Sequence, residues 1–183
     1  MSDSEANYLD RFSSWLRTLG DDAEALGELV ADEQLPVAAR QAIAGGINFV
    51  FKSLDLIPDG IDDIGYLDDA FVLRVSAAMA SVELESAGVS SVLGNIKRLA
   101  EETEVVREFL EQDYDRLQAY VSGLRRGAAR GRSSADVVEH PPTREAFLSD
   151  LRGFAKSYQA PGFAREGKNL IKLRAFFEAK LPK

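Results

Sequence analysis

Between residues 92 and 124, positions at alternating intervals of four and three residues form the most regular pattern in the chain. This spacing places side chains on one face of a long helix and is typical of a heptad seam. A helix of about 35 residues would be about 50 Å long, so it either pairs with a second copy or bends near Thr103 or Asp113 and packs internally. We favour internal packing. The positions are Val92, Ile96, Leu99, Thr103, Val106, Leu110, Asp113, Leu117, Tyr120 and Leu124.

Apolar residues at intervals of three and four recur over almost the whole sequence, whereas the alternating pattern of strands is nearly absent. The chain is therefore predicted to be all-α, a helical bundle of about six to seven helices with an aspartate-rich turn between two of them and a C-terminal helical pair. We expect a first helix that stops at Gly20, a third over residues 37–54 and a fourth over residues 67–86.

Charge is distributed unevenly along the chain. Residues 1–122 hold 24 acidic and 9 basic side chains, whereas residues 143–183 hold 4 and 9, within a formal net charge of −8. Residues 123–142, rich in glycine, arginine, serine and proline, have the composition of a linker. We predict an acidic helical body, a basic linker and a basic tail of amphipathic helices. The tail either docks on its own body or meets an anionic partner, and the complementary charge within the chain favours docking.

The composition excludes several kinds of functional site. No cysteine is present and His140 is the only histidine, so disulfides, thiolate metal sites and the usual zinc ligand sets are ruled out. The acidic, polar N-terminus does not resemble a secretory signal, and no apolar stretch reaches the roughly 20 residues that a bilayer span needs. We expect a cytoplasmic protein without a transmembrane span, with His140 in an exposed loop.

Six aspartates fall within the fifteen residues of DLIPDGIDDIGYLDD, residues 55–69, and no lysine or arginine lies within residues 53–73. One interpretation is structural. An aspartate before residue 67 caps the next helix, while Asp68 and Asp69 lie in its first turn, where the helix dipole favours negative charge. Distant arginines then balance the remaining carboxylates.

The other interpretation is a site for a hard divalent cation. Mg²⁺ and Ca²⁺ prefer oxygen ligands and would relieve the repulsion among carboxylates gathered in a tight turn between two helices. An EF-hand counted from Asp55 would need an oxygen ligand at Ile57 and a glutamate at Tyr66, so the spacing matches no standard calcium loop. The candidate metal ligands are Asp55, Asp59, Asp63 and Asp69.

Two five-residue blocks in this region carry a resemblance to a known family. DLIPD at residues 55–59 and GYLDD at residues 65–69, with an apolar helix before and after, resemble the YkvA-like family, a bacterial domain of unknown function (domain of unknown function 1232). The resemblance covers about residues 40–80. It implies a helical hairpin with an aspartate-rich turn, and no established catalytic activity. Family members usually carry an apolar segment with a second proline between the blocks, where this chain has Asp62 and Asp63.

These observations support functions of two classes. The first is a non-enzymatic, cytoplasmic helical module that binds a protein partner or a second copy of itself through the seam at 92–124 or the tail at 143–183. The second is a divalent-metal-dependent hydrolase or phosphoryl-processing enzyme that uses the aspartate-rich loop, although no recognisable general base or basic clamp lies beside the carboxylates. Contact of the basic last helix with a membrane surface is a third alternative. Nucleic-acid binding is not expected, because no base-reading motif is present.

Overall fold

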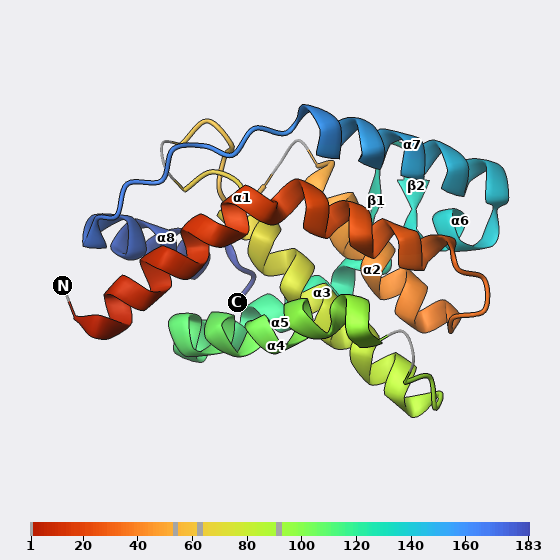
Figure 1. Cartoon of the computed structure of the whole chain (residues 1–183), viewed down its shortest axis with the longest axis horizontal. Coiled ribbons are helices and arrows are strands. Elements are labelled where there is room, and N and C mark those ends of the chain that lie inside the picture. The colour runs from red at the N-terminus through yellow and green to blue at the C-terminus, as the bar shows by residue number, and fades with distance from the viewer. Residues whose placement is uncertain (1, 53–54, 62–63, 91–92) are drawn as a thin grey trace.

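The protein is a bundle of helices in the computed structural model, which describes residues 2–52, 55–61, 64–90 and 93–183. The predicted all-α class is confirmed, and in those ranges one small hairpin is the only sheet. In chain order (Figure 1), the elements are α1 (Asp3–Ala31), α2 (Val37–Val50), α3 (Leu67–Ser86), α4 (Leu93–Leu110), the one-turn helix η1 (Glu111–Asp113), α5 (Tyr114–Leu124), β1 (Ala128–Ala129), β2 (Arg132–Ser133), α6 (Ser134–Glu139), α7 (Pro141–Ser157) and α8 (Gly167–Lys180).

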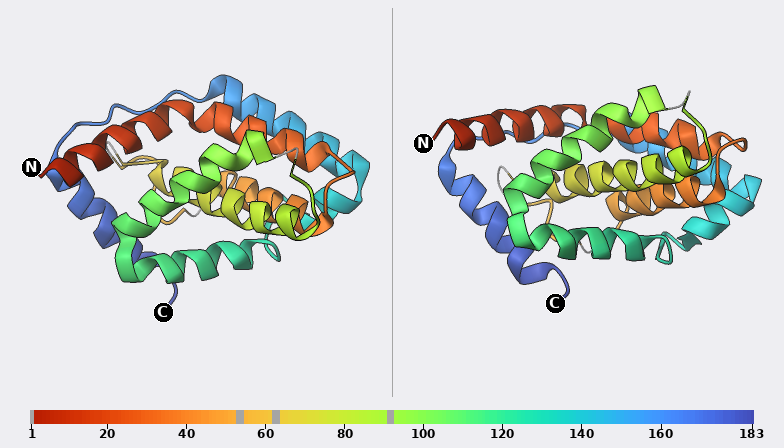
Figure 2. Two further views of the ribbon diagram at one scale, coloured as in Figure 1. Left: turned by 60° about the horizontal axis from the view of Figure 1, so that its bottom comes forward. Right: turned by 90° about the horizontal axis from the view of Figure 1, so that it is seen from below.

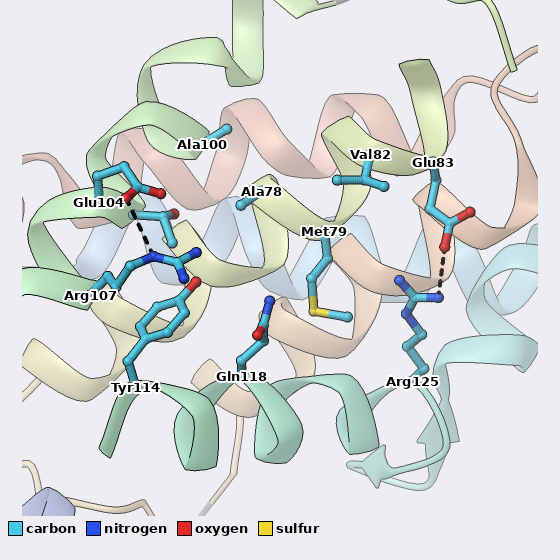
Figure 3. Close-up of a pocket in the computed structure, with 11 residues that line it drawn as sticks. Ala78, Met79, Val82, Glu83, Ala100, Glu104, Arg107, Tyr114, Gln118 and Arg125 are labelled. Carbon is cyan, nitrogen blue, oxygen red and sulfur yellow. Dashed lines mark hydrogen bonds and ion pairs between the residues drawn. The ribbon is translucent and has the colours of Figure 1, made fainter. Parts of the chain in front are cut away.

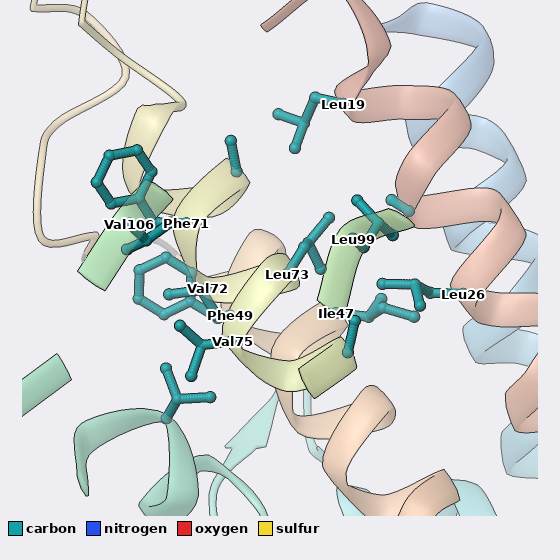
Figure 4. Packing of buried hydrophobic residues seen from close by; sticks show 14 of the residues in the cluster. Leu19, Leu26, Ile47, Phe49, Phe71, Val72, Leu73, Val75, Leu99 and Val106 are labelled. Carbon is teal, nitrogen blue, oxygen red and sulfur yellow. The ribbon is translucent and has the colours of Figure 1, made fainter. Parts of the chain in front are cut away.

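α3 lies at the centre of the bundle and has the predicted bounds. It packs against α1, α2, α4 and α5, and buried residues occur on every face of it. A helix that buries all of its faces is one that other helices surround. Figure 4 shows Phe71, Leu73 and Val75 of α3 within the core, together with Leu19 of α1 and Leu99 of α4.

α1 is one continuous helix, so the predicted stop at Gly20 is wrong. Gly20 lies where α7 approaches α1: a Cβ atom at this position would come within 3.3 Å of the Ala155 carbonyl oxygen. Because glycine has no side chain, α1 and α7 can pack closely at this position. Gly20 does not end the helix.

α2 also differs from its prediction, because it ends at Val50, before the predicted end at residue 54. Residues 53 and 54 lie outside the described ranges.

The long heptad pattern is divided between two helices. α4 ends at Leu110, η1 reverses the chain, and α5 turns back toward the other end of the molecule (Figure 2). Glu111, in the reversal, has a φ of 52°. The predicted bend near Asp113 and the internal packing are thus confirmed, while Val92 lies outside the described residues. Buried seam residues are Ile96, Leu99, Thr103, Val106, Leu110, Leu117 and Leu124.

Residues 123–142 form regular structure where the composition predicted a linker. β1 and β2 make an antiparallel hairpin whose turn residues, Arg130 and Gly131, have φ values of 51° and 75°, as tight hairpin turns require. Ser133 then caps α6 in a capping box. α6 buries Val137 in the core, so this segment belongs to the body.

The C-terminal region docks on the acidic body. α7 lies along α1, and α8 packs near the start of α1 (Figure 1). Ion pairs join Arg165 to Asp10 at 2.7 Å and Arg144 to Glu33. Both surfaces predicted to bind a partner, the seam and the apolar face of the tail, are therefore covered by the chain itself. The buried tail residues include Phe147, Leu151, Leu170, Leu173 and Phe177.

No described helix combines the length and the apolar character needed to cross a membrane.

A buried ion network ties α3 to its neighbours. The fully buried Arg74 guanidinium lies 3.3 Å from Asp22 of α1 and 2.8 Å from Glu102 of α4. It also stacks 4.0 Å from the centroid of the Trp15 ring. Burial lowers the pKa of Arg74 to about 10, so it remains charged at neutral pH. Arg98 of α4 pairs with Asp22 as well, so the carboxylate in this part of the core has two partners.

Arg74→Met tests how much the bundle depends on this network. The substitution keeps much of the buried volume but leaves Asp22 and Glu102 short of a counter-charge, so we expect a loss of about 3 kcal/mol in the free energy of unfolding. Urea unfolding followed by the fluorescence of Trp15, the only tryptophan, measures it. Arg126→Met, at an exposed position, is the matched control. A loss below about 1 kcal/mol would show that the network contributes little.

Candidate functional site

The aspartates of the predicted site meet where α2 connects to α3. Asp68 and Asp69 lie in the first turn of α3 but are only 0% and 1% exposed, because this central helix is enclosed. A side-chain oxygen of Asp68 accepts a 2.9 Å hydrogen bond from the backbone N–H of Ile57, which holds the connection against α3. Asp55 is half-buried and Asp59 lies at the surface.

Burial raises the pKa of four carboxyl groups, which we call the aspartate cluster (Asp55, Asp59, Asp68 and Asp69), and repulsion between the charges raises it further for Asp55, Asp68 and Asp69. Desolvation is the first cause in each. The pKa of Asp55 rises to about 6, with a contribution from Asp59, and that of Asp68 to about 7, with one from Asp55. The pKa of Asp69 is raised well above its usual range by burial and by the other three charges. The four groups therefore act as one electrostatic unit.

The cluster has no ion-pair partner in the described part of the chain, although the charge of Lys52 acts on Asp55. None of its carboxylates forms an ion pair within the ranges that the structure describes. One oxygen each of Asp55, Asp68 and Asp69 is buried there without a hydrogen-bond donor. Asp22, by contrast, is equally buried and has two arginine partners. Backbone N–H groups of Ile57 and of the first turn of α3 favour the charged form of Asp68, but in the described ranges no arginine balances Asp68 or Asp69, as the structural interpretation requires.

Three tyrosines from different parts of the chain feel the charge of the cluster. Tyr66 precedes α3, Tyr120 lies on α5 and Tyr158 follows α7. Burial raises the pKa of each, and carboxylates of the cluster raise it further. The rings of Tyr66 and Tyr158 contact each other, and that of Tyr120 contacts Phe49; charges in such partly apolar surroundings interact more strongly than in water.

The predicted ligands are placed as follows. Asp55, Asp59 and Asp69 belong to the cluster, whereas Asp63 lies outside the described residues. Asp68, which lies beside Asp69 in the first turn of α3, was not among the predicted ligands. The tyrosines were not predicted either, since their approach to the loop is tertiary and leaves no local pattern.

The carboxylates are not yet arranged as a coordination shell. In the described part of the chain, no three acidic or histidine side chains are disposed so as to hold a metal ion. Binding a cation here would require the side chains to rotate toward it. Asp55 and Asp59 border solvent, so a cation would reach the buried pair from their side.

A separate groove lies between α3, α4 and α5 (Figure 3). Its volume is about 440 Å³, and Met79 contributes to its apolar lining. The charged residues that line it are already paired, Glu83 with Arg125 at 3.1 Å and Glu104 with Arg107 at 3.3 Å. It therefore lacks the uncompensated charge that distinguishes the aspartate cluster.

Comparisons of the chain with protein-family models, with curated proteins and with solved structures found no match. The resemblance to the YkvA-like family stays a prediction from the motifs at 55–59 and 65–69.

The aspartate cluster predicts an unusual dependence of stability on pH. The pKa values of Asp55 and Asp68, about 6 and about 7, lie above the value of about 3.9 for an unfolded chain, so the folded protein binds protons more tightly. This contribution to stability is fully present below about pH 4 and is lost as the pH rises through 6 and 7. We expect the chelator-treated protein to unfold at a higher temperature at pH 5 than at pH 8, measured by circular dichroism.

Asp69→Asn supplies the variant for this measurement. The amide has a similar shape but no charge, so at pH 8 we expect a higher unfolding temperature, because an unpaired buried charge is removed, and a weaker pH dependence. Asp115→Asn, at an exposed position on α5, should change neither. A wild-type unfolding temperature that rises from pH 5 to pH 8 would contradict this account of the cluster.

Proposed function

We propose that this chain is a divalent-cation-binding helical protein, in which the aspartate cluster holds a hard cation such as Mg²⁺, Ca²⁺ or Mn²⁺. The observation that carries the proposal is the pair Asp68 and Asp69, buried with unpartnered oxygens and with no ion-pair partner in the described structure. Ionised carboxylates in such a place cost several kcal/mol each unless a counter-charge compensates them. Protons compensate them at low pH, and a cation from solvent can do so at higher pH.

The chemistry of the donors supports a hard cation. All of the candidate ligands are carboxylate oxygens, and the chain contains no cysteine. Mg²⁺, Ca²⁺ and Mn²⁺ take such ligands, whereas zinc sites usually include nitrogen or sulfur. Because ligands must lose their protons, we expect the affinity to rise between pH 6 and pH 8.

Binding is better supported than hydrolysis. Lys52 is the basic residue whose charge lowers the pKa of Asp55, and a single lysine is a poor clamp for a phosphorylated substrate. The proposed role is therefore non-enzymatic, as a cation-dependent module. A cytoplasmic setting is part of the proposal and is supported by the absence of cysteine.

Calorimetric titration of the chelator-stripped protein at pH 7.5 with each of the three cations tests the proposal. We expect saturable binding of one cation per chain, weakened by a factor of about 10 or more in Asp69→Asn and in Asp59→Asn, because each removes a charged ligand. Asp115→Asn, which removes an exposed carboxylate away from the cluster, should bind as the wild type does. Heat no larger than dilution for all three cations would overturn the proposal.

A further inference from the structure

Tyr158 is anchored to α1 where the tail passes the aspartate cluster. It follows the last residue of α7, and its hydroxyl donates a 2.7 Å hydrogen bond to the carbonyl oxygen of Leu16. The packing here is close: a Cβ atom on Gly20 would lie 3.6 Å from the Tyr158 ring. Two residues of α1 therefore determine where this ring sits.

The Tyr158 ring meets the residue that begins α3. Its edge packs against Tyr66, with ring centroids 5.4 Å apart and planes at 89°. Tyr66 is the N-cap of α3 and adopts a left-handed backbone, φ 65°, which is unfavourable for a residue other than glycine. Its side chain makes no capping hydrogen bond, so the contact with Tyr158 is an interaction that can hold it there.

The strained turn carries the buried aspartates. Asp68 and Asp69 follow Tyr66 by two and three residues, within the first turn of α3. On the other side, a Cβ atom at Gly65 would lie 2.5 Å from the Asp59 carbonyl oxygen, so the loop is folded tightly on itself. A change in the backbone at Tyr66 would therefore move the ligands on both sides of it.

We infer that Tyr158 is the positioning residue of the cation site: held by α1, it fixes Tyr66 and the turn that carries Asp68 and Asp69. This inference rests on the proposed function. Asp69 and Asp59 both raise the pKa of Tyr158, which agrees with a ring close to the carboxylates. Tyr158 touches no cation in this scheme and acts through Tyr66 and by excluding water.

A consequence is that cation binding and docking of the tail are coupled. Residues 158–166 have no regular secondary structure and lead from α7 to α8. If the docked tail favours the binding geometry, the bound cation must favour the docked tail by the same factor. The affinity for the cation then depends on whether the C-terminal region is docked on α1.

Mn²⁺ titration by calorimetry on the full chain compares the wild type with Tyr158→Ala and Tyr158→Phe. We expect Tyr158→Ala to weaken Mn²⁺ binding by a factor of about 10 or more, as for other residues that orient metal ligands. Tyr158→Phe keeps the ring contact with Tyr66 but loses the hydrogen bond to Leu16, so we expect a loss of affinity smaller than that of Tyr158→Ala. Phe176→Ala, which removes a half-buried aromatic residue of α8, is the control for general loosening of the tail.

Two further readouts separate positioning from stability. In a cycle with Tyr66→Ala, the double variant should bind no more weakly than the weaker single variant, because both rings act through one contact. Hydrogen exchange of residues 158–166 in the wild type should slow when Mn²⁺ is added.

The outcomes are distinct. Absence of Mn²⁺ binding by the wild type, together with absence of Mg²⁺ and Ca²⁺ binding, would overturn both the proposed function and this inference. Wild-type binding that Tyr158→Ala leaves unchanged, or that Phe176→Ala weakens equally, would overturn the inference alone.

Discussion

The enclosure of α3 is the constraint on which the rest of the structure depends. Residues 67–77 of this helix are all buried among its neighbours, so each charged group in that part needs a partner inside the protein. Arg74 has four, namely Asp22, Glu102, the Ala70 carbonyl oxygen and the Trp15 ring. Six residues earlier, Asp68 has one hydrogen bond from a loop, and no ion pair for it or Asp69 is found in the described structure. The same burial that builds the core thus creates the site.

Much of the fold follows from local patterns. The bounds of α3 and the reversal near Asp113 could be predicted from the sequence. Apolar residues at intervals of three and four mark a helix, and a polar residue that interrupts this pattern marks a bend, so both signals lie among neighbouring residues. Gly20 is a position where local patterns give the wrong prediction. A glycine after an apolar stripe usually ends a helix, but here it admits the backbone of Ala155, which lies 135 positions later in the sequence. The same holds for residues 123–142, whose small and charged residues serve a hairpin and a capped helix.

The sequence predicted that aspartates form the candidate site, but not that some of them are buried. Clustered carboxylates and the absence of nearby lysine and arginine are visible in the sequence, so Asp55, Asp59 and Asp69 could be named as candidate ligands. The sequence does not show that the first turn of α3 is buried. Because of this burial, the charge of Asp68 opposes folding above neutral pH, whereas a helix end in water would stabilise it. Tyr120 and Tyr158 reach the loop from segments distant in sequence, so tertiary packing alone reveals them.

The docking of the tail on α1 also has a consequence for the order in which the protein can fold as it is synthesised. α1 is synthesised before α7 and α8, whose residues cover part of it and are made more than 100 residues later. At about 5–20 residues per second, that interval is on the order of 10 s. During this interval the part of α1 that α7 and α8 later cover is exposed to solvent or bound by a chaperone, whereas α2, α3 and α4 can already pack against the rest. Tyr158 is made late as well, so its contact with Tyr66 forms only after the aspartates have been synthesised.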